Sequence, residues 1–138
     1  MQTFLPFSSY QESARCLDRL RLGKQRLECQ AIAKALVGES KGWANHPATK
    51  MWRKNIGSLC KYWEAVIYEW KSREYKDNTL LELQRIIYQY SINDVTPPSW
   101  LGDPMFHLSH QSNLLRKDRD HYIKYFNVPD NLEYVWPV

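Results

Sequence analysis

Hydrophobic residues along this chain recur at intervals of three and four, which is the period of an amphipathic helix. The first such stretch follows Pro6 and a capping pattern of serines and a glutamate, and it predicts a helix that ends at about Leu36, before Gly38. After a loop of turn-forming residues, the same period predicts a second long helix over roughly residues 48–75. We therefore expect two long helices in the first half of the chain.

The second half of the chain predicts three shorter helices. Capping residues at 77–78 stand before a third helix that continues to about Tyr90, where a proline-rich stretch follows. A proline at the first helical position opens a fourth helix over about 103–117, and a fifth covers 120–126. The final segment, PDNLEYVWPV, is aromatic and is expected to be extended.

Composition indicates the class of fold. The chain has 138 residues, of which 43% are hydrophobic and 14% aromatic, so it can build a core and does not resemble a disordered chain. Neither strand-like alternation nor an internal repeat interrupts the helical pattern. We therefore predict an all-α fold, a single compact domain of long packed helices that covers residues 1–138.

The cysteines indicate the compartment. Cys16, Cys29 and Cys60 are odd in number and lack the close spacing of a metal or redox motif, and each falls in a predicted helix. This favours buried free thiols in a reducing environment. No stretch approaches the ~18 apolar residues of a membrane span, and the first residues do not look like a signal peptide. We expect a cytoplasmic protein that does not associate with membranes.

Charge is the first indication of a partner. The formal net charge is +4 and the pI is about 9.0, which is compatible with a polyanion such as nucleic acid without requiring one. In the segment LDRLRLGKQRLE, a helical wheel places apolar and charged residues on one broad side: Leu17, Leu20, Leu27, Arg21, Lys24 and Glu28. The opposite side carries a basic ridge that is either solvated or in contact with phosphates, formed by Arg15, Arg19 and Arg26.

Two explanations are open for the three charged residues that share a side of this helix with the leucines. Isolated charges cost several kcal/mol to bury unless they pair, so Arg21, Lys24 and Glu28 could form a structural ion network. Alternatively, they line a cleft that binds an anionic ligand and keeps Glu28 available for chemistry. Gly23 weakens the helix by about 1 kcal/mol relative to alanine, and it lets another group approach the backbone closely.

The fourth predicted helix carries a second polar cluster. FHLSHQSNLLRK places His107 and His110 on one side, together with Asn113 and Lys117. Two histidines at this spacing could bind a metal, but no third ligand is evident, and we predict no metal site. Hydrogen bonds to phosphates or base edges suit these side chains better, and packing at a helix junction is the structural alternative.

Three motifs together resemble a known family. LDRLRLGKQRLE near the start, GWANHPATKMW in the middle and WLGDPMFHLSHQSNLLRKDRDHY near the end are similar to the pyrimidine dimer DNA glycosylase family, most closely to its bacterial branch. The likeness covers nearly the whole chain. It implies an endonuclease V-like all-α fold and a DNA repair enzyme that is both a DNA glycosylase and an abasic-site lyase, with no cofactor.

The resemblance also implies roles for individual residues. In the family, an N-terminal α-amine attacks C1′ of the damaged nucleotide's sugar and a helix glutamate assists. Here these groups are the amine of Met1 and the carboxylate of Glu28. The partner is double-stranded DNA with a damaged or modified base, bound by a monomer. The residues expected to bind it are Arg21, Lys24, Gln25, Arg26, His46, His107, His110, Asn113 and Arg116.

Two positions depart from the family's pattern. Leu27 separates an arginine and a glutamate that are adjacent in other branches. Gln2 is large, so Met1 is expected to remain and to supply the amine, with Lys24 as a substitute nucleophile. Two other functions are open: an enzyme that acts on modified rather than damaged bases, and a DNA-binding module that lacks catalysis.

Overall fold

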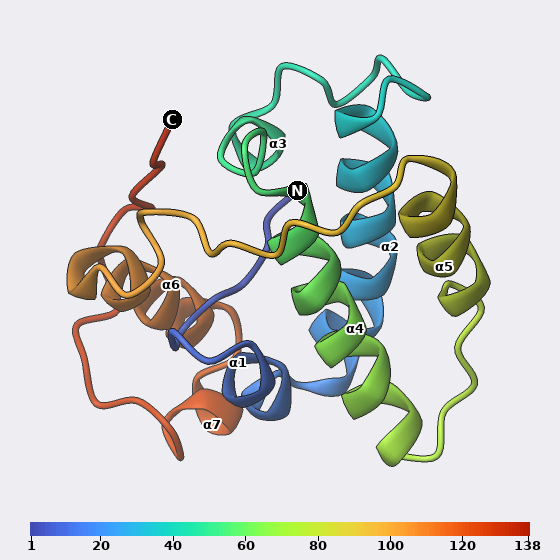
Figure 1. Ribbon diagram of the computed structural model, residues 1–138. Coiled ribbons are helices and arrows are strands. Elements are labelled where there is room, and N and C mark those ends of the chain that lie inside the picture. Colours follow the sequence, from blue (N-terminus) through green and yellow to red (C-terminus); the bar gives the residue numbers. More distant parts are fainter.

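The computed structural model describes residues 1–138, which form seven α-helices and no strand (Figure 1). The helices are α1 Tyr10–Cys16, α2 Arg19–Leu36, α3 Pro47–Lys50, α4 Ile56–Ser72, α5 Leu80–Gln89, α6 Pro104–Lys117 and α7 Arg119–Tyr122. One cluster of 25 buried hydrophobic residues forms the core, and the three cysteines are buried free thiols. None of the helices combines the length and the apolar character needed to cross a membrane. The predicted all-α fold is confirmed.

The first predicted helix is two helices in the structure. α1 ends and α2 begins around Leu17 and Asp18, whose backbones are extended. The backbone N–H of Asp18 donates to the hydroxyl of Tyr122 at 3.0 Å, and this hydroxyl donates to the Asp18 carboxylate. The expectation of one continuous helix up to Leu36 is therefore wrong, because a contact with a residue far along the chain holds a bend that the local pattern does not reveal.

The second predicted helix is also divided. His46 caps the short helix α3, and α4 starts only at Ile56, after a turn that contains Trp52. The Trp52 ring is fully buried, and its indole N–H donates to the Thr3 hydroxyl at 3.1 Å. Burial of this ring against the start of the chain stabilises the turn. α5 and α6 lie where they were predicted, whereas α7 ends at Tyr122, earlier than predicted.

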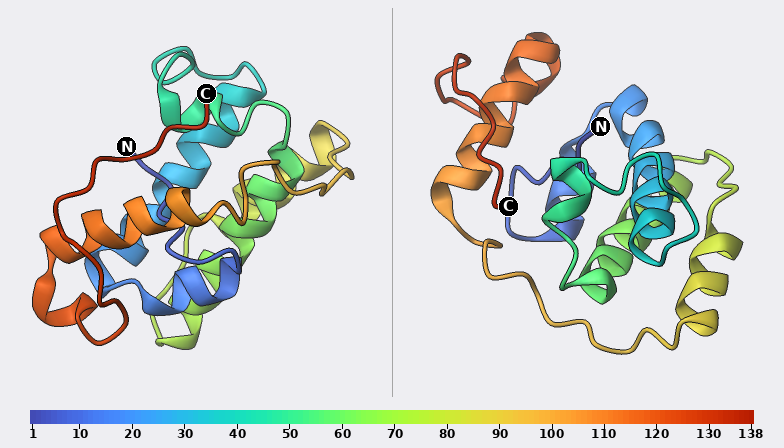
Figure 2. Two further views of the ribbon diagram at one scale, coloured as in Figure 1. Left: turned by 90° about the vertical axis from the view of Figure 1, so that its left-hand side faces the viewer. Right: turned by 90° about the horizontal axis from the view of Figure 1, so that it is seen from above.

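Helix α4 is central to the fold and packs against α1, α2 and α5 (Figures 1 and 2). Its side chains Tyr62 and Trp63 are fully buried. A Cβ atom at Gly23 of α2 would lie 3.0 Å from the ring of Trp70 on α4. The close approach expected at this glycine is therefore the packing of an indole ring between two helices.

Helix α6 holds the N-terminal segment, which runs between the α6–α7 pair and α4 (Figure 1). His110 Nδ1 accepts the N–H of Leu5 at 3.0 Å, and His107 Nδ1 donates to the Leu5 carbonyl at 2.7 Å. Gln111 donates to the carbonyl of Pro6 at 2.8 Å. The segment belongs to no helix or sheet, so these side chains satisfy backbone groups that would otherwise be buried without partners.

The same helix holds the C-terminal tail, residues 129–138, which is extended as predicted (Figure 2). The hydroxyl of Ser112 accepts the N–H of Leu132 at 3.0 Å, and the hydroxyl of Ser109 accepts the N–H of Val135 at 3.1 Å. Both ends of the chain therefore lie beside α6, and this helix positions them relative to the rest of the fold.

Candidate functional site

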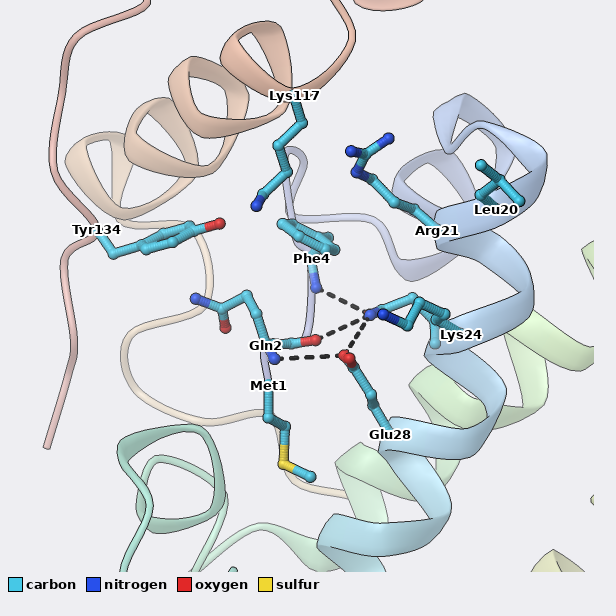
Figure 3. A pocket seen from close by; sticks show the side chains of 10 residues that line it. Met1, Gln2, Phe4, Leu20, Arg21, Lys24, Glu28, Lys117 and Tyr134 are labelled. Carbon is cyan, nitrogen blue, oxygen red and sulfur yellow. Dashed lines mark hydrogen bonds between the residues drawn. The ribbon is translucent and has the colours of Figure 1, made fainter.

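A pocket of about 430 Å³ opens where both ends of the chain meet α2 (Figure 3). This volume is within the range of small-molecule sites in proteins. α2 forms one wall, and the N-terminal segment, the end of α6 and the tail form the rest. The lining residues are Met1, Gln2, Phe4, Leu20, Arg21, Lys24, Gln25, Glu28, Lys117 and Tyr134.

Gln25 connects the N-terminal segment to Glu28. Its Nε2 donates to the carbonyl of Gln2 at 2.8 Å and to Oε2 of Glu28 at 2.9 Å. Its Oε1 accepts the N–H of Phe4 at 2.9 Å and the hydroxyl of Tyr62 at 2.9 Å. Both donors of this buried amide are therefore used within the protein, and its oxygen accepts from Phe4 and faces the Tyr62 hydroxyl, whose one proton is shared with the Phe4 carbonyl at 2.6 Å. In the structure Gln25 positions Glu28, and the DNA contact expected of Gln25 stays a prediction.

The carboxylate of Glu28 faces the start of the chain. The backbone N–H of Gln2 donates to Glu28 Oε2 at 3.3 Å, so the α-amine of Met1 is one residue away from this contact (Figure 3). No ion pair in the structure involves Glu28. A carboxylate held by neutral donors in the wall of a pocket is available to a ligand.

The charged side chains of the pocket do not pair with one another. Arg21 pairs with Asp18 at 3.2 Å, whereas Lys24 and Lys117 have no ion-pair partner. The structural ion network considered for Arg21, Lys24 and Glu28 is therefore absent. Three cations and one carboxylate line a single pocket, which favours an anionic ligand. No group of three or more His, Cys, Asp or Glu side chains in the structure is placed to hold a metal ion.

Arg26 is buried rather than part of a solvated ridge, which corrects the helical wheel. Its guanidinium donates to Asp77 Oδ1 at 2.9 Å and lies 4.5 Å from the ring centroid of Trp70. Leu20 and Leu27, which were expected on the core side, are 65% and 50% exposed. The wheel is wrong here because only tertiary packing brings the Asp77 carboxylate to α2. The phosphate contact of Arg26 stays a prediction, with its guanidinium turned away from the pocket.

The two histidines of α6 are buried and do not line the pocket. Burial and the neighbouring His107 lower the pKa of His110 to about 3, so its imidazole is neutral. Arg116 donates to the carbonyl of Leu132 at 2.8 Å and to the side chain of Asn113. The polar side of α6 thus binds the ends of its own chain, as in the structural alternative, and the DNA contacts expected of these four residues stay predictions.

His46 caps α3 and stands between two tryptophans. Its Nδ1 accepts the N–H of Ala48 at 3.0 Å, and its ring centroid lies 5.3 Å from that of Trp43 and 6.0 Å from that of Trp136. Burial and the positive charge of the N-terminal amine lower the pKa of His46, while Glu28 acts in the opposite direction. The fold therefore gathers the loop before α3, the start of the chain and the tail around one region.

Five lining residues were not predicted as site residues, namely Gln2, Phe4, Leu20, Lys117 and Tyr134. Figure 3 shows the Tyr134 ring across the pocket from Arg21 and α2. Burial raises the pKa of Tyr134 to about 12, so its side chain remains an uncharged phenol at neutral pH. The aromatic character of the tail is visible in the sequence, but no local pattern indicates that the tail reaches α2.

The chain was compared with known proteins. A family model described as "Pyrimidine dimer DNA glycosylase" matches residues 1–83, which is more than half of the chain. The match includes the N-terminal segment, all of α2 and therefore both Met1 and Glu28. Lys117 and Tyr134, which complete the pocket, lie outside it. No curated protein and no solved structure matches the chain.

Proposed function

The chain belongs to the pyrimidine dimer DNA glycosylase family, and we propose that it is a DNA repair enzyme with both glycosylase and abasic-site lyase activity. The observation that carries this proposal is the hydrogen bond from the N–H of Gln2 to Glu28 Oε2 at 3.3 Å, next to the bridging amide of Gln25. It holds Met1 beside the carboxylate of a pocket that is lined by cations.

The proposed nucleophile is the α-amine of Met1. Its nitrogen forms a bond to C1′ of the damaged nucleotide, and the bond between C1′ and the base breaks, with its electron pair leaving on the base, which takes up a proton. The sugar ring then opens, and nitrogen and C1′ form an imine. Positive charge develops at C1′ in the transition state, and the carboxylate of Glu28 stabilises it.

Strand cleavage is a second step at the same site. A proton acceptor of the enzyme, acting as general base, removes a proton from C2′ of the imine. The 3′ phosphate departs with the electron pair of its bond to C3′. Water then hydrolyses the imine and frees the amine. Glu28 is suited to accept the C2′ proton, and Lys24 and Lys117 are suited to hold the phosphates on either side because no carboxylate neutralises them.

Borohydride trapping tests the nucleophile. Reduction during incubation with duplex DNA that contains one abasic site should give a covalent adduct, and peptide mass analysis should locate it at Met1. Extension of the N-terminus by two residues should abolish the adduct while the helical circular dichroism is retained. Lys24→Gln removes the side-chain amine that α2 contributes to the pocket. This variant should still form the adduct at Met1.

The outcomes separate the alternatives. An adduct that maps to Lys24 would make the lysine the nucleophile. Tight binding of abasic DNA with neither an adduct nor a nick would contradict the lyase activity and support a non-catalytic module. Base release from modified bases alone, with none from DNA that contains pyrimidine dimers, would support an enzyme of modified DNA.

A further inference from the structure

Tyr62 of α4 contacts the N-terminal segment from within the core. Its side chain is fully buried and does not line the pocket, so it cannot touch a ligand that binds there. Its hydroxyl donates to the carbonyl of Phe4 at 2.6 Å and lies 2.9 Å from Oε1 of Gln25. A phenol has one proton, and this proton is shared between the two acceptors. A single hydroxyl therefore connects α4 both to the start of the chain and to the amide that holds Glu28.

The position of this hydroxyl is fixed by the packing of its ring. The ring centroid of Tyr62 lies 6.5 Å from that of Trp52, in a stacked arrangement, and 5.5 Å from that of Tyr10, edge to face. Burial raises the pKa of Tyr62 well above its ordinary value, so the phenol keeps its proton at neutral pH. The hydroxyl is therefore a permanent donor in a constant place.

The two acceptors of Tyr62 lead to the two groups proposed to react. The carbonyl of Phe4 belongs to the same short segment as Met1, whose α-amine is the proposed nucleophile. The amide of Gln25 donates to the carbonyl of Gln2 at 2.8 Å and to Oε2 of Glu28 at 2.9 Å. The amine and the carboxylate are thus held by neighbouring groups that meet at one hydroxyl. Movement of either group alters the distance between them.

We propose that Tyr62 is a positioning residue that holds Phe4 and Gln25 together and thereby sets the separation of the Met1 amine and the Glu28 carboxylate. This role rests on the proposed function. Without the hydroxyl, the Phe4 carbonyl loses its donor and the Gln25 oxygen keeps only the N–H of Phe4. A buried carbonyl without a donor is costly, so the segment must shift or admit water. Displacement of reacting groups by about 1 Å can slow a reaction about a hundredfold.

Other side chains hold the N-terminal segment without a connection to α2. Trp52 donates to the Thr3 hydroxyl at 3.1 Å, and His110 accepts the N–H of Leu5 at 3.0 Å. Neither ring forms a hydrogen bond with a residue of α2. Loss of one of these contacts would loosen the segment and leave the carboxylate of α2 where it is. Tyr62 differs because its hydroxyl lies against the segment and against α2 at once.

Tyr62→Phe tests this role because it keeps the ring and removes only the hydroxyl. On duplex DNA that contains one abasic site, at saturating concentration, the single-turnover rate of strand cleavage per folded molecule should fall about ten- to a hundredfold. The affinity for the same duplex, measured by fluorescence anisotropy, should not change. Tyr10→Phe is the matched control. Its hydroxyl belongs to the same aromatic cluster but bonds to Ser58, and its removal should leave the rate unchanged.

A double-mutant cycle tests the connection through Gln25. Gln25→Met keeps the length of the side chain and removes its amide, so this variant should itself cleave slowly. The connection between Phe4 and α2 is then already broken, and Tyr62→Phe should slow the Gln25→Met protein far less than it slows the wild type. Losses that multiply would show that the two side chains act independently, which would overturn the role proposed for Tyr62.

Hydrogen exchange in the absence of DNA gives a measurement that does not depend on catalysis. The backbone N–H groups of Gln2 and Phe4 donate to Glu28 and Gln25, so Tyr62→Phe should accelerate their exchange. The N–H of Leu5, which His110 accepts, is the reference within the same sample and should exchange as in the wild type. Unchanged exchange at Gln2 and Phe4 would overturn the positioning role.

The cleavage assay has further outcomes that would contradict the role. Cleavage by Tyr62→Phe at the wild-type rate per folded molecule would overturn it, and so would a loss confined to DNA affinity. An equal loss in Tyr10→Phe would indicate a general effect of core packing. If Tyr62→Phe does not fold, Gln25→Met decides the question. A wild-type rate in that variant overturns the role, and a slow rate with unchanged affinity supports it.

The same samples separate failure of this role from failure of the proposed function. A wild type that is trapped on abasic DNA, together with a Tyr62→Phe protein of normal rate and normal exchange, would overturn the positioning role alone. A wild type that forms no imine, together with faster exchange at Gln2 and Phe4 in Tyr62→Phe, would overturn the lyase and leave the placement of these groups by Tyr62 intact.

Discussion

The two sides of α2 use charge in opposite ways. Toward α5, the guanidinium of Arg26 is buried and donates to Asp77 at 2.9 Å. Toward the pocket, Lys24 and Glu28 have no ion-pair partner, and Glu28 is held by the neutral amide of Gln25 and by a backbone N–H. A charge that is neutralised inside the protein stabilises the fold, whereas a charge held by neutral groups at a pocket is available for a ligand.

Asp77 shows how complete the pairing is on the α5 side. Burial opposes its ionisation, but hydrogen bonds from the Arg26 guanidinium, the Thr79 hydroxyl and the N–H groups of Thr79 and Leu80 hold the pKa of Asp77 below its ordinary value. The bonds to the N–H groups also cap the start of α5. The Asp77 carboxylate therefore connects α2 to α5. On the pocket side, neither Lys24 nor Glu28 forms an ion pair that connects α2 to another segment.

The largest effect is expected from Glu28→Gln. The amide keeps the shape of the side chain and can still accept from Gln25, but it cannot stabilise positive charge at C1′ or take up a proton. Strand cleavage should fall about 10²- to 10⁴-fold in single-turnover assays. The melting temperature should hardly change, and DNA affinity should persist or rise because a negative charge has left a cationic pocket.

Glu64→Gln is the matched control for this variant. The Glu64 side chain is 61% exposed on α4, outside the pocket, and its neutralisation should leave cleavage unchanged. A Glu28→Gln protein that melts much earlier but cleaves at the wild-type rate per folded molecule would place Glu28 with Arg26 among the structural charges.

The reverse result is expected from Arg26→Met. Methionine can still pack on Trp70, but it leaves a carboxylate with a 2% exposed side chain without its cation, so the free energy of unfolding should fall by about 3 kcal/mol in urea titrations. Cleavage per folded molecule should stay within about twofold of wild type. Arg19→Met, at an exposed and unpaired arginine of the same helix, should cost almost nothing. A stable Arg26→Met protein with weak DNA binding would instead give Arg26 the phosphate contact predicted from the sequence.

A pH dependence of stability is expected from His110. Its pKa is about 3 in the folded protein and about 6.5 when unfolded, so only the unfolded chain takes up a proton as the pH falls below about 6.5. The stabilising contribution is therefore complete above that pH, and the free energy of unfolding should fall by roughly 1.4 kcal/mol per pH unit below it. Urea titrations between about pH 6.5 and pH 5 measure this slope.

Substitution isolates the contribution of His110. The pKa of His46 is also lowered and adds a slope of the same sign, so the comparison must be made between variants. His110→Gln should remove most of the slope, and His121→Gln should leave it in place. An unchanged slope in His110→Gln would mean that the His110 ring of the wild type is protonated in the folded protein. A positive charge would then lie next to the backbone of Leu5.

The smallest effect is expected in the salt dependence of DNA binding. If Lys24 neutralises one phosphate, Lys24→Gln should make the slope of log affinity against log salt shallower by roughly 0.9. Lys61→Gln removes an equal charge that lies outside the pocket and next to Glu64, and it should leave the slope unchanged. Equal changes in both variants would show that net charge, rather than the pocket, sets the affinity.

Much of the fold follows from local pattern. Asp103, which caps α6, and Pro104, its first residue, predict where this helix begins, because these are interactions within one helix. The breaks at Asp18 and Trp52 could not be predicted, because each depends on a hydrogen bond to a distant residue, Tyr122 and Thr3 respectively. The same limit applies to Tyr134, whose place in the pocket depends on side chains of α6 that hold the tail.

The residues alone identify helical segments, a cationic cluster that contains a carboxylate, and the likeness to a DNA glycosylase family, because these depend on residues that are close in sequence. Tertiary structure decides which of the charges pair. It brings Asp77 to Arg26, and it leaves Glu28 with the amide of Gln25 and the first residues of the chain. A helical wheel treats all charges on a helix alike, whereas the energy of each depends on the groups that other parts of the chain place around it.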